Sequence, residues 1–307
     1  MAKHLVTLRE WTPREISEVV DLGIKVKKNP KKYASALRGK MLAMLFQKTS
    51  TRTRVSFEVG MEQLGGHAVV LDWTKTQFGI ADIRDETRAL CRYCDVIMAR
   101  LLRNADLRAM ASASSVPVIN GCDEKFHPCQ ALADAMTIKE SFGKTKGVRV
   151  AYLGIANNVS NSLSLALTGL GMEFTLCSPE RHPPSLDRDL LKSVKSTGRY
   201  NETKDVEKAV KSADVIYTDT WMDMELMEDP KLRKEMERRA GLLGPYQVNS
   251  GLLRLNPKAR IMHDMPMHVG HEITREAIES PRSLIFEQAE NRLHVQKALL
   301  LRLLRKA

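Results

Sequence analysis

Short apolar runs alternate with helix-like segments along almost the whole 307-residue chain. The first helical pattern covers residues 12–28, with Thr12 as N-cap and Pro13 at the first helical position. The predicted strands are residues 40–46, 67–73, 95–100, 116–120, 149–155, 173–179, 214–219 and 259–265. Strand–helix alternation of this kind predicts an α/β fold with doubly wound parallel sheets.

The chain is long enough for two domains of ordinary size. A long helix predicted at 128–142 is followed by GKTKG at 143–147, which has the composition of a hinge. We therefore expect two doubly wound parallel-sheet domains joined by a long helix. The expected boundaries are 1–142 for the first domain, 143–282 for the second, and 283–307 for a C-terminal helix that returns to the first domain.

The net charge of the chain is +11, a balance that suits nucleic acid, an anionic surface or a phosphorylated substrate. Only 5% of the residues are aromatic, and no basic motif is interleaved with aromatic residues, so nucleic acid is disfavoured. No apolar run reaches the ~18 residues that a membrane-spanning helix needs. The N-terminal sequence MAKHLVTLREWTPREI has charges where a secretory signal would be apolar.

Five cysteines are an odd number for a disulfide framework, so we expect free thiols in a reducing cytoplasm. Cys91 and Cys94 form a CxxC inside a helical pattern predicted over 82–94, and no second CxxC accompanies it. Because a structural zinc site needs four ligands, we interpret these two residues as buried thiols rather than as a metal site.

Polar clusters follow six of the predicted strands at the point where each strand ends. They begin at Thr49, Arg100, Asn120, Gly154, Asp219 and His263. In parallel α/β sheets, ligands bind outside the carboxyl ends of the strands. We therefore expect these clusters to form the functional site.

The cluster TSTRTR at 49–54 opens a helix after the first strand. The free N–H groups of a helix N-terminus, the hydroxyls of Ser50, Thr51 and Thr53, and two guanidinium groups are together typical of an anion site. By itself the pattern fits a solvated helix start equally well. It contains no GxxxxGK[ST], so a nucleoside triphosphate is not implied.

Two motifs in this order point to a known family. STRTR stands at 50–54, and HPCQALAD at 127–134 matches the pattern HPxQxLxD about 75 residues later. The chain thus resembles the aspartate/ornithine carbamoyltransferase family over essentially its whole length. SFEVG after the first motif and NRLH at 291–294 resemble the ornithine branch.

By this resemblance, one group of residues would bind carbamoyl phosphate: Ser50, Thr51, Arg52, Thr53, Gln77, Arg100, His127, Gln130, Met265 and Arg292. Gln77 would do so in the site of a neighbouring subunit, which implies a homotrimer or a multiple of trimers. The residues expected to act in catalysis are Arg52, Arg100, His127, Gln130, Asp264 and Arg292. Donors fixed at a developing oxyanion are typically the largest catalytic contribution. No metal or organic cofactor is implied.

The acceptor would be held by Asn158, Asp219, Asp223 and Met224. Asp223 and Glu225 stand where the ornithine branch has Ser and Gly, and these departures leave the acceptor open.

A third departure is Asp264, which replaces the usual Cys of that branch. Its carboxylate is expected either to anchor an ammonium group or to take its proton. The alternative is that it points away and pairs with His268 or His271.

The implied activity is transfer of the carbamoyl group of carbamoyl phosphate to the δ-amine of L-ornithine, giving L-citrulline and phosphate. Carboxylates on the acceptor side indicate a cationic acceptor and disfavour aspartate, and ornithine with its two amines fits best. Lysine, putrescine or another diamine stays open because Asp223 and Glu225 depart from the pattern of the ornithine branch. A second alternative is a repurposed relative that binds a phosphorylated ligand without catalysis.

Overall fold

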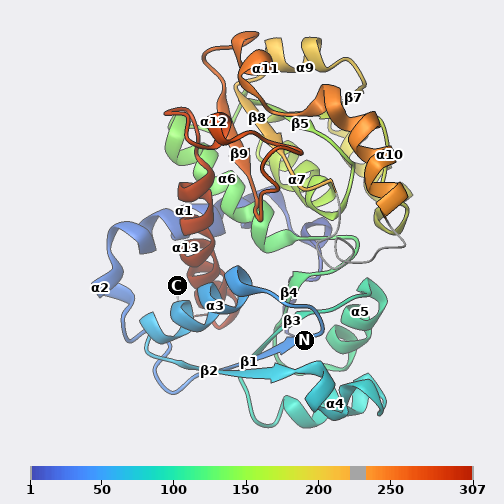
Figure 1. Ribbon diagram of the computed structural model, residues 1–307. Coiled ribbons are helices and arrows are strands. Elements are labelled where there is room, and N and C mark those ends of the chain that lie inside the picture. The colour runs from blue at the N-terminus through green and yellow to red at the C-terminus, as the bar shows by residue number, and fades with distance from the viewer. Residues whose placement is uncertain (1, 222–232, 306–307) are drawn as a thin grey trace.

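The computed structural model describes residues 2–221 and 233–305, which form two α/β domains (Figure 1). The first domain contains a four-stranded sheet in the order β2-β1-β3-β4, and every neighbouring pair of strands is parallel. Its strands are β1 (Met41–Phe46), β2 (His67–Asp72), β3 (Val96–Arg100) and β4 (Val118–Cys122). The central strands β1 and β3 are apolar and almost fully buried, as their sequence predicted.

The second domain contains a five-stranded parallel sheet in the order β7-β6-β5-β8-β9. Its strands are β5 (Arg149–Leu153), β6 (Glu173–Cys177), β7 (Tyr200–Thr203), β8 (Val215–Thr218) and β9 (Arg260–His263). The edge strand β7 was not predicted, because its sequence YNET is short and mostly polar, and it extends the sheet only through its backbone pairing with β6.

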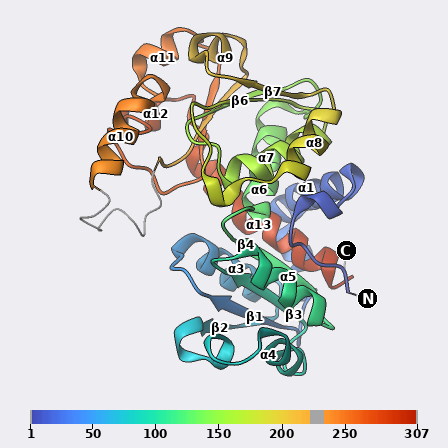
Figure 2. The same cartoon turned by 90° about the vertical axis from the view of Figure 1, so that its right-hand side faces the viewer.

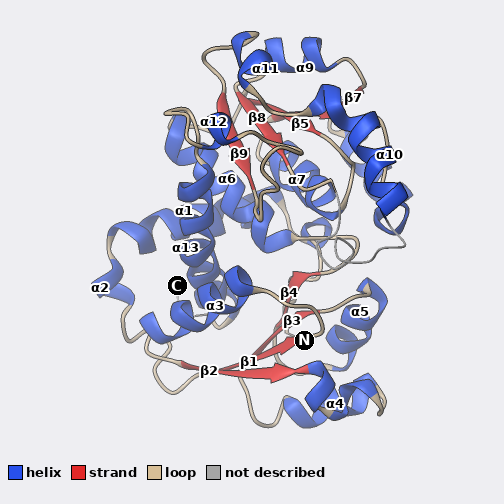
Figure 3. Cartoon of the chain, viewed as in Figure 1, coloured by secondary structure: helices blue, strands red, loops and turns tan. Residues whose placement is uncertain are grey.

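Helices cover the faces of both sheets (Figure 3). They are α1 (Pro13–Lys28), α2 (Pro30–Tyr33), α3 (Thr51–Gln63), α4 (Ile83–Leu90), α5 (Asn104–Ala113), α6 (Pro128–Phe142), α7 (Asn158–Gly169), α8 (Arg188–Ser196), α9 (Val206–Ser212), α10 (Arg233–Leu243), α11 (Ser250–Arg254), α12 (Arg275–Ile278) and α13 (Ile285–Leu303). Short 3-10 segments are η1 (Leu8–Glu10), η2 (Trp73–Lys75), η3 (Gln77–Gly79), η4 (Pro183–Ser185) and η7 (Gly244–Tyr246). Among these helices, none is long and apolar enough to cross a membrane.

The two sheets are joined through α6 and α13, which lie at the junction between them (Figure 2). Helix α6 connects the first sheet to the second, and most of its length is buried. Helix α13 returns from the second sheet and packs against α1, α3 and α6. The predicted fold class, two doubly wound domains joined by a long helix with a returning C-terminal helix, is confirmed.

Local signals explain how closely the helix boundaries could be predicted. Thr12 caps α1 through a complete capping box with Glu15, and α6 covers the predicted residues 128–142. Helix α3 begins at Thr51, where the Ser50 hydroxyl accepts a hydrogen bond from the Thr53 N–H, so TSTRTR opens a helix as predicted. The anion motif is therefore the first turn of the helix itself.

The CxxC motif was predicted to lie within a helix over 82–94, and this prediction is wrong. Helix α4 ends at Leu90, so Cys91 follows directly after it and Cys94 lies in the turn that leads to β3. Both are free thiols; Cys91 is buried, whereas Cys94 is only half-buried. The prediction of two buried thiols is thus correct for Cys91 and wrong for Cys94.

Candidate active site

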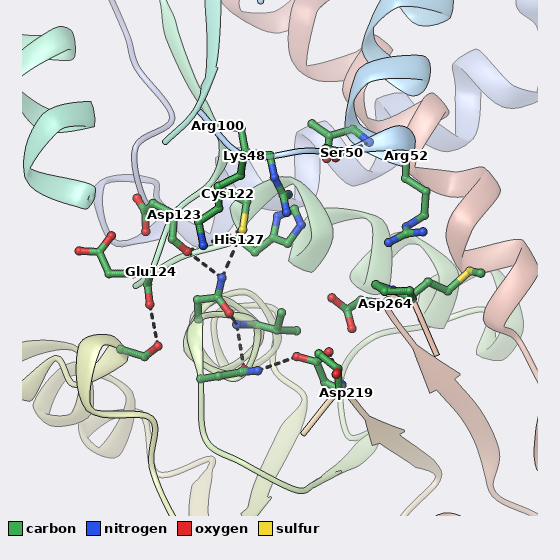
Figure 4. Close-up of a pocket in the computed structure, with 18 of the residues that line it drawn as sticks. Lys48, Ser50, Arg52, Arg100, Cys122, Asp123, Glu124, His127, Asp219 and Asp264 are labelled. Atoms are coloured by element: carbon green, nitrogen blue, oxygen red, sulfur yellow. Dashed lines mark hydrogen bonds between the residues drawn. The ribbon is translucent and has the colours of Figure 1, made fainter. Parts of the chain in front are cut away.

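The N-termini of α3 and α7 face a common cavity between the two domains (Figure 4). Each helix follows a strand at which the order of its sheet reverses: β1 lies between β2 and β3, and β5 lies between β6 and β8. Ligands of doubly wound sheets bind at such points. The cavity has a volume of about 250 Å³ and is lined by residues of both domains.

The first turn of α3 forms one wall of this cavity. Ser50, Thr51, Arg52 and Thr53 all line it, so the structure brings together the residues predicted to hold an anion. Burial lowers the pKa of the Arg52 guanidinium from its usual value, and the Asp264 carboxyl acts in the opposite direction. Arg54 does not line the cavity and lies 3.5 Å from Glu58 on the same helix.

Arg100 and His127 extend the same wall of the cavity. Arg100 ends β3, where the pairing with β4 is irregular, and its Nε is buried with no hydrogen-bond partner in the described part of the chain. The His127 backbone N–H donates to the Ser162 hydroxyl at 2.7 Å, which fixes the start of α6. Burial and the charges of three nearby arginines hold the pKa of His127 well below its usual value. Its imidazole is therefore neutral at pH 7 and able to donate one hydrogen bond.

Arg292 reaches the same wall from α13. Its guanidinium donates to the Gln130 side-chain oxygen at 2.6 Å and to the Thr53 hydroxyl at 2.8 Å. Arg292 lines the cavity, whereas Gln130 lies behind it and donates in turn to Asp134 at 2.8 Å. In this structure Gln130 thus orients Arg292, and its predicted contact with a ligand stays a prediction.

Asp134 is a buried carboxyl that joins the two domains. It accepts hydrogen bonds from Gln130 of α6, Gln288 of α13 and Tyr217 of β8, at 2.8, 2.7 and 3.2 Å. Burial raises the pKa of Asp134 to about 7, because it disfavours the charged form more than the three donors favour it. The folded protein therefore holds a proton at pH values where an unfolded aspartate has released it.

The free energy of unfolding should consequently depend on pH through Asp134. Its contribution is complete below a pH of about 4 and is lost as the pH rises to about 7, at up to about 1.4 kcal/mol per pH unit. In urea unfolding from pH 5 to 8, the stability of the wild type relative to Asp134→Asn should fall up to pH 7 and then become constant. A constant difference over the whole range would contradict this assignment.

The opposite wall of the cavity is formed around Asp219, which follows β8 and is only 4% exposed. Asn157 donates to its carboxylate at 2.6 Å, and the Thr220 N–H donates at 2.6 Å. Asn158 lines the cavity but donates to the backbone oxygen of Asp123 at 2.7 Å, so it links the two domains.

Sequence reasoning selected Asn158 and Asp219 but missed Asn157 and Asp123, which also line the cavity. Asp123 lies directly after β4, and Asn157 caps α7 in the loop that follows β5; both belong to polar clusters at the carboxyl end of a strand, and this position was the signal that could have identified them.

Asp264 lies between Arg52 and Asp219 (Figure 4). Its side chain is 8% exposed, and its Oδ1 atom has no hydrogen-bond partner in the described residues. Burial and the neighbouring Asp219 hold the pKa of Asp264 well above its usual value, because two carboxylates this close resist ionising together. The alternative that Asp264 points away toward His268 or His271 is wrong, since the side chain lines the cavity.

Asp219, His263 and Asp264 have potential metal-binding atoms within 4.8 Å of one another. His263, however, offers no free nitrogen to a metal. Its Nδ1 accepts the Met265 N–H at 2.9 Å, and its Nε2 lies 3.2 Å from Glu272. The cluster is better understood as a pair of carboxyls beside a histidine that is already fully hydrogen-bonded.

The remaining predicted residues lie in different places. Met265 lines the cavity with a φ of +62°, in the left-handed region. Gln77 begins η3 and does not line the cavity of its own chain. Asp223, Met224 and Glu225 lie outside the described residues, so their predicted contribution to the acceptor site has no structural counterpart here.

A helix N-terminus with three arginines on one wall suits an anionic ligand, and the pair of carboxyls on the other wall suits a cationic one, as in a group transferase. The comparisons agree with this class. The model of the carbamoyl-P binding domain of aspartate/ornithine carbamoyltransferase matches residues 3–140, and the model of the Asp/Orn binding domain matches residues 146–303. The chain belongs to the aspartate/ornithine carbamoyltransferase family.

Several relatives match over nearly the full length. The chain is 44% identical to an ornithine carbamoyltransferase of Pyrococcus abyssi, with 98% of this chain and 96% of that protein covered. The solved structure of the Pyrococcus furiosus ornithine carbamoyltransferase is similar with a TM-score of 0.90 at 42% identity, covering 98% of this chain and 96% of that one. The Thermus thermophilus enzyme gives a TM-score of 0.87 at 38% identity, covering 99% of both chains.

Proposed function

We infer that this protein transfers the carbamoyl group of carbamoyl phosphate to the δ-amine of L-ornithine, giving L-citrulline and phosphate. The observation that carries this conclusion is the cavity in which the cationic wall of α3 faces the Asp219–Asp264 carboxyl pair. The full-length relatives named ornithine carbamoyltransferase support the same reaction. We expect positioning and charge stabilisation to supply most of the catalysis.

On the donor side, Ser50, Thr51, Arg52 and Thr53 would bind the phosphate through hydroxyls, the helix N-terminus and a planar guanidinium. Arg100 would bridge the phosphate and the carbonyl oxygen.

The carbonyl oxygen gains negative charge as the amine attacks. Neutral His127 would donate to it, and Arg292 would add a charge held in place by Gln130. Gln130 would also hold the carbamoyl amide after a small shift of Arg292, and the Met265 carbonyl would accept from the same amide.

On the acceptor side, Asp219 would accept from the α-ammonium group, and Asn158 would complete the contacts. Asp223 and Met224 are proposed to contact the acceptor on the resemblance alone.

Asp264 has a separate role in this proposal. A cationic acceptor would ionise the carboxyl pair, because opposite charge favours the carboxylate form. The Asp264 carboxylate would then take the proton of the δ-ammonium, leaving the neutral amine that attack requires. Its buried position raises its proton affinity and brings it closer to that of the amine.

The acceptor is tested by a citrulline assay with carbamoyl phosphate and, in parallel, ornithine, lysine and putrescine. We expect ornithine to have a kcat/KM at least ten times that of either alternative. Product formed only with lysine or putrescine would overturn the ornithine assignment and keep the carbamoyltransferase class. Tight carbamoyl phosphate binding by calorimetry without turnover of any amine would instead indicate a repurposed binding protein.

Residues 1–142 are proposed to bind carbamoyl phosphate and 143–282 the acceptor, while 283–307 bring Arg292 back to the first domain.

We also propose a homotrimer in the cytoplasm, in which Gln77 reaches the site of a neighbouring subunit. The exposed apolar side chains of this region support such an interface: Val55, Val59, Val69 and Ile80. The free cysteines are in keeping with a reducing compartment.

A further inference from the structure

Glu272 is a buried carboxyl for which the proposed chemistry has no use. Its side chain is fully buried, and it is absent from the residues that line the cavity. It lies between the loop after β9 and α12, where its backbone oxygen accepts from the Val248 N–H at 2.9 Å. A buried carboxyl is costly unless it is hydrogen-bonded, so its partners indicate what it does.

The first partner of Glu272 is His263, which is also fully buried. The His263 Nδ1 atom accepts the Met265 N–H at 2.9 Å, so the ring proton must lie on Nε2. This Nε2 lies 3.2 Å from the Glu272 carboxylate, to which it donates. Glu272 thereby selects the imidazole tautomer in which Nδ1 is free to accept.

Met265 needs this support because of its backbone conformation. Its φ of +62° lies in the left-handed region, which residues with a Cβ rarely adopt. The hydrogen bond from its N–H to His263 holds the peptide in this orientation at the cavity wall. The His263 backbone is itself anchored, since its N–H donates to Gln288 at 2.9 Å.

A second set of contacts connects Glu272 with the segment that carries Asp219. The same Oε1 atom accepts the backbone N–H of His268. The His268 Nδ1 lies 2.8 Å from the Thr220 hydroxyl, and the Thr220 N–H donates to Asp219 at 2.6 Å. One buried carboxylate therefore connects the Asp264–Met265 segment with the Asp219–Thr220 segment.

We propose that Glu272 is a positioning residue: through His263 it orients Met265 toward the carbamoyl group, and through His268 it sets the spacing of the two carboxyl-bearing segments. This proposal rests on the proposed carbamoyl transfer but concerns a residue that touches neither substrate. It predicts a much larger loss in kcat than in carbamoyl phosphate binding, because the phosphate would be held by the first turn of α3 in the other domain and only the carbamoyl amide would contact Met265.

The test compares Glu272→Ala with Glu272→Gln. The Gln oxygen can still accept from His263 and His268, and its amide would take the place of Oε2, which accepts no hydrogen bond from the described residues and lies 3.9 Å from the His268 Nδ1. We expect Gln to keep kcat within about fivefold, and Ala to lower kcat about 100-fold, as expected for a displacement of about 1 Å at a reacting group. The KM for carbamoyl phosphate should change less than threefold. Glu279→Ala, at a position whose side chain is 68% exposed, is the matched control and should leave both kcat and KM unchanged.

If Glu272→Ala does not fold, Glu272→Asp replaces it. Its shorter side chain cannot reach both partners, and kcat should fall about tenfold. An alanine or aspartate variant with wild-type kcat would overturn the proposal, as would a glutamine variant as impaired as alanine.

A crystal structure of Glu272→Ala gives an answer that does not depend on turnover. We expect Met265 to leave the left-handed region or to lose its bond to His263, and unchanged geometry would overturn the proposal. Absence of turnover by the wild type with every amine would contradict the proposed function alone.

Discussion

Replacing Arg52 with alanine should lower kcat/KM for carbamoyl phosphate by about 1,000-fold. The substitution removes a planar guanidinium from the first turn of α3, where it lines the cavity and interacts with the charge of Asp264. Loss of one donor that stabilises developing charge typically costs 100- to 1,000-fold, and the lost phosphate contact adds to this. Steady-state citrulline kinetics, with calorimetry of carbamoyl phosphate binding, would measure both parts.

The chain offers a matched control two positions along. Arg54 belongs to the same motif and the same helix turn, but it is exposed, lies near Glu58 and does not line the cavity. We expect Arg54→Ala to keep kcat/KM within about threefold. Arg52→Lys should recover only part of the activity, because lysine keeps the charge but not the two-pronged geometry. Equal losses from the two alanine variants would refute the assignment.

Asp264→Asn should lower kcat for ornithine about 100-fold at pH 7, which is within the range expected for the loss of a proton acceptor. The variant is nearly isosteric, and its amide N–H can donate to Asp219 in place of the proton that the carboxyl pair holds. The fold should therefore be retained, and carbamoyl phosphate binding should be unchanged. Rapid-mixing or steady-state assays at saturating ornithine isolate this effect on kcat.

The same variant separates the two roles considered for Asp264. If its carboxylate only anchors the ammonium group, the KM for ornithine should rise while kcat stays constant. Asp264→Cys gives a useful comparison, since a thiol is the usual group of the ornithine branch at this position. We expect it to retain more activity than the asparagine variant. A kcat for Asp264→Asn equal to that of the wild type would exclude proton transfer to this residue.

Much of the fold could be predicted because its signals are local. The apolar runs MLAMLF and VIMAR are buried on both faces of the first sheet, so their composition alone identified β1 and β3. Strand β7 was missed because its two middle residues are exposed polar side chains, and only its pairing with β6 makes it a strand.

The donor side was predicted from two motifs together. Ser50 through Thr53 are contiguous and follow a strand, a pattern that by itself fits an anion site and a solvated helix start equally well. The motif HPCQALAD at 127–134 favoured the anion site.

The amino-acid sequence by itself determined the order of the strands and helices apart from β7, the position of the TSTRTR motif at the start of a helix, and the resemblance to the family. These features depend on neighbours in the chain, where spacing and residue type suffice. Only the tertiary structure decided that Asp264 shares its site with Asp219, that Gln130 lies behind Arg292, and that Glu272 connects the two acceptor segments. These contacts join residues from different strands and domains. Their protonation states and orientations follow from burial and from the partners that folding brings within hydrogen-bond distance.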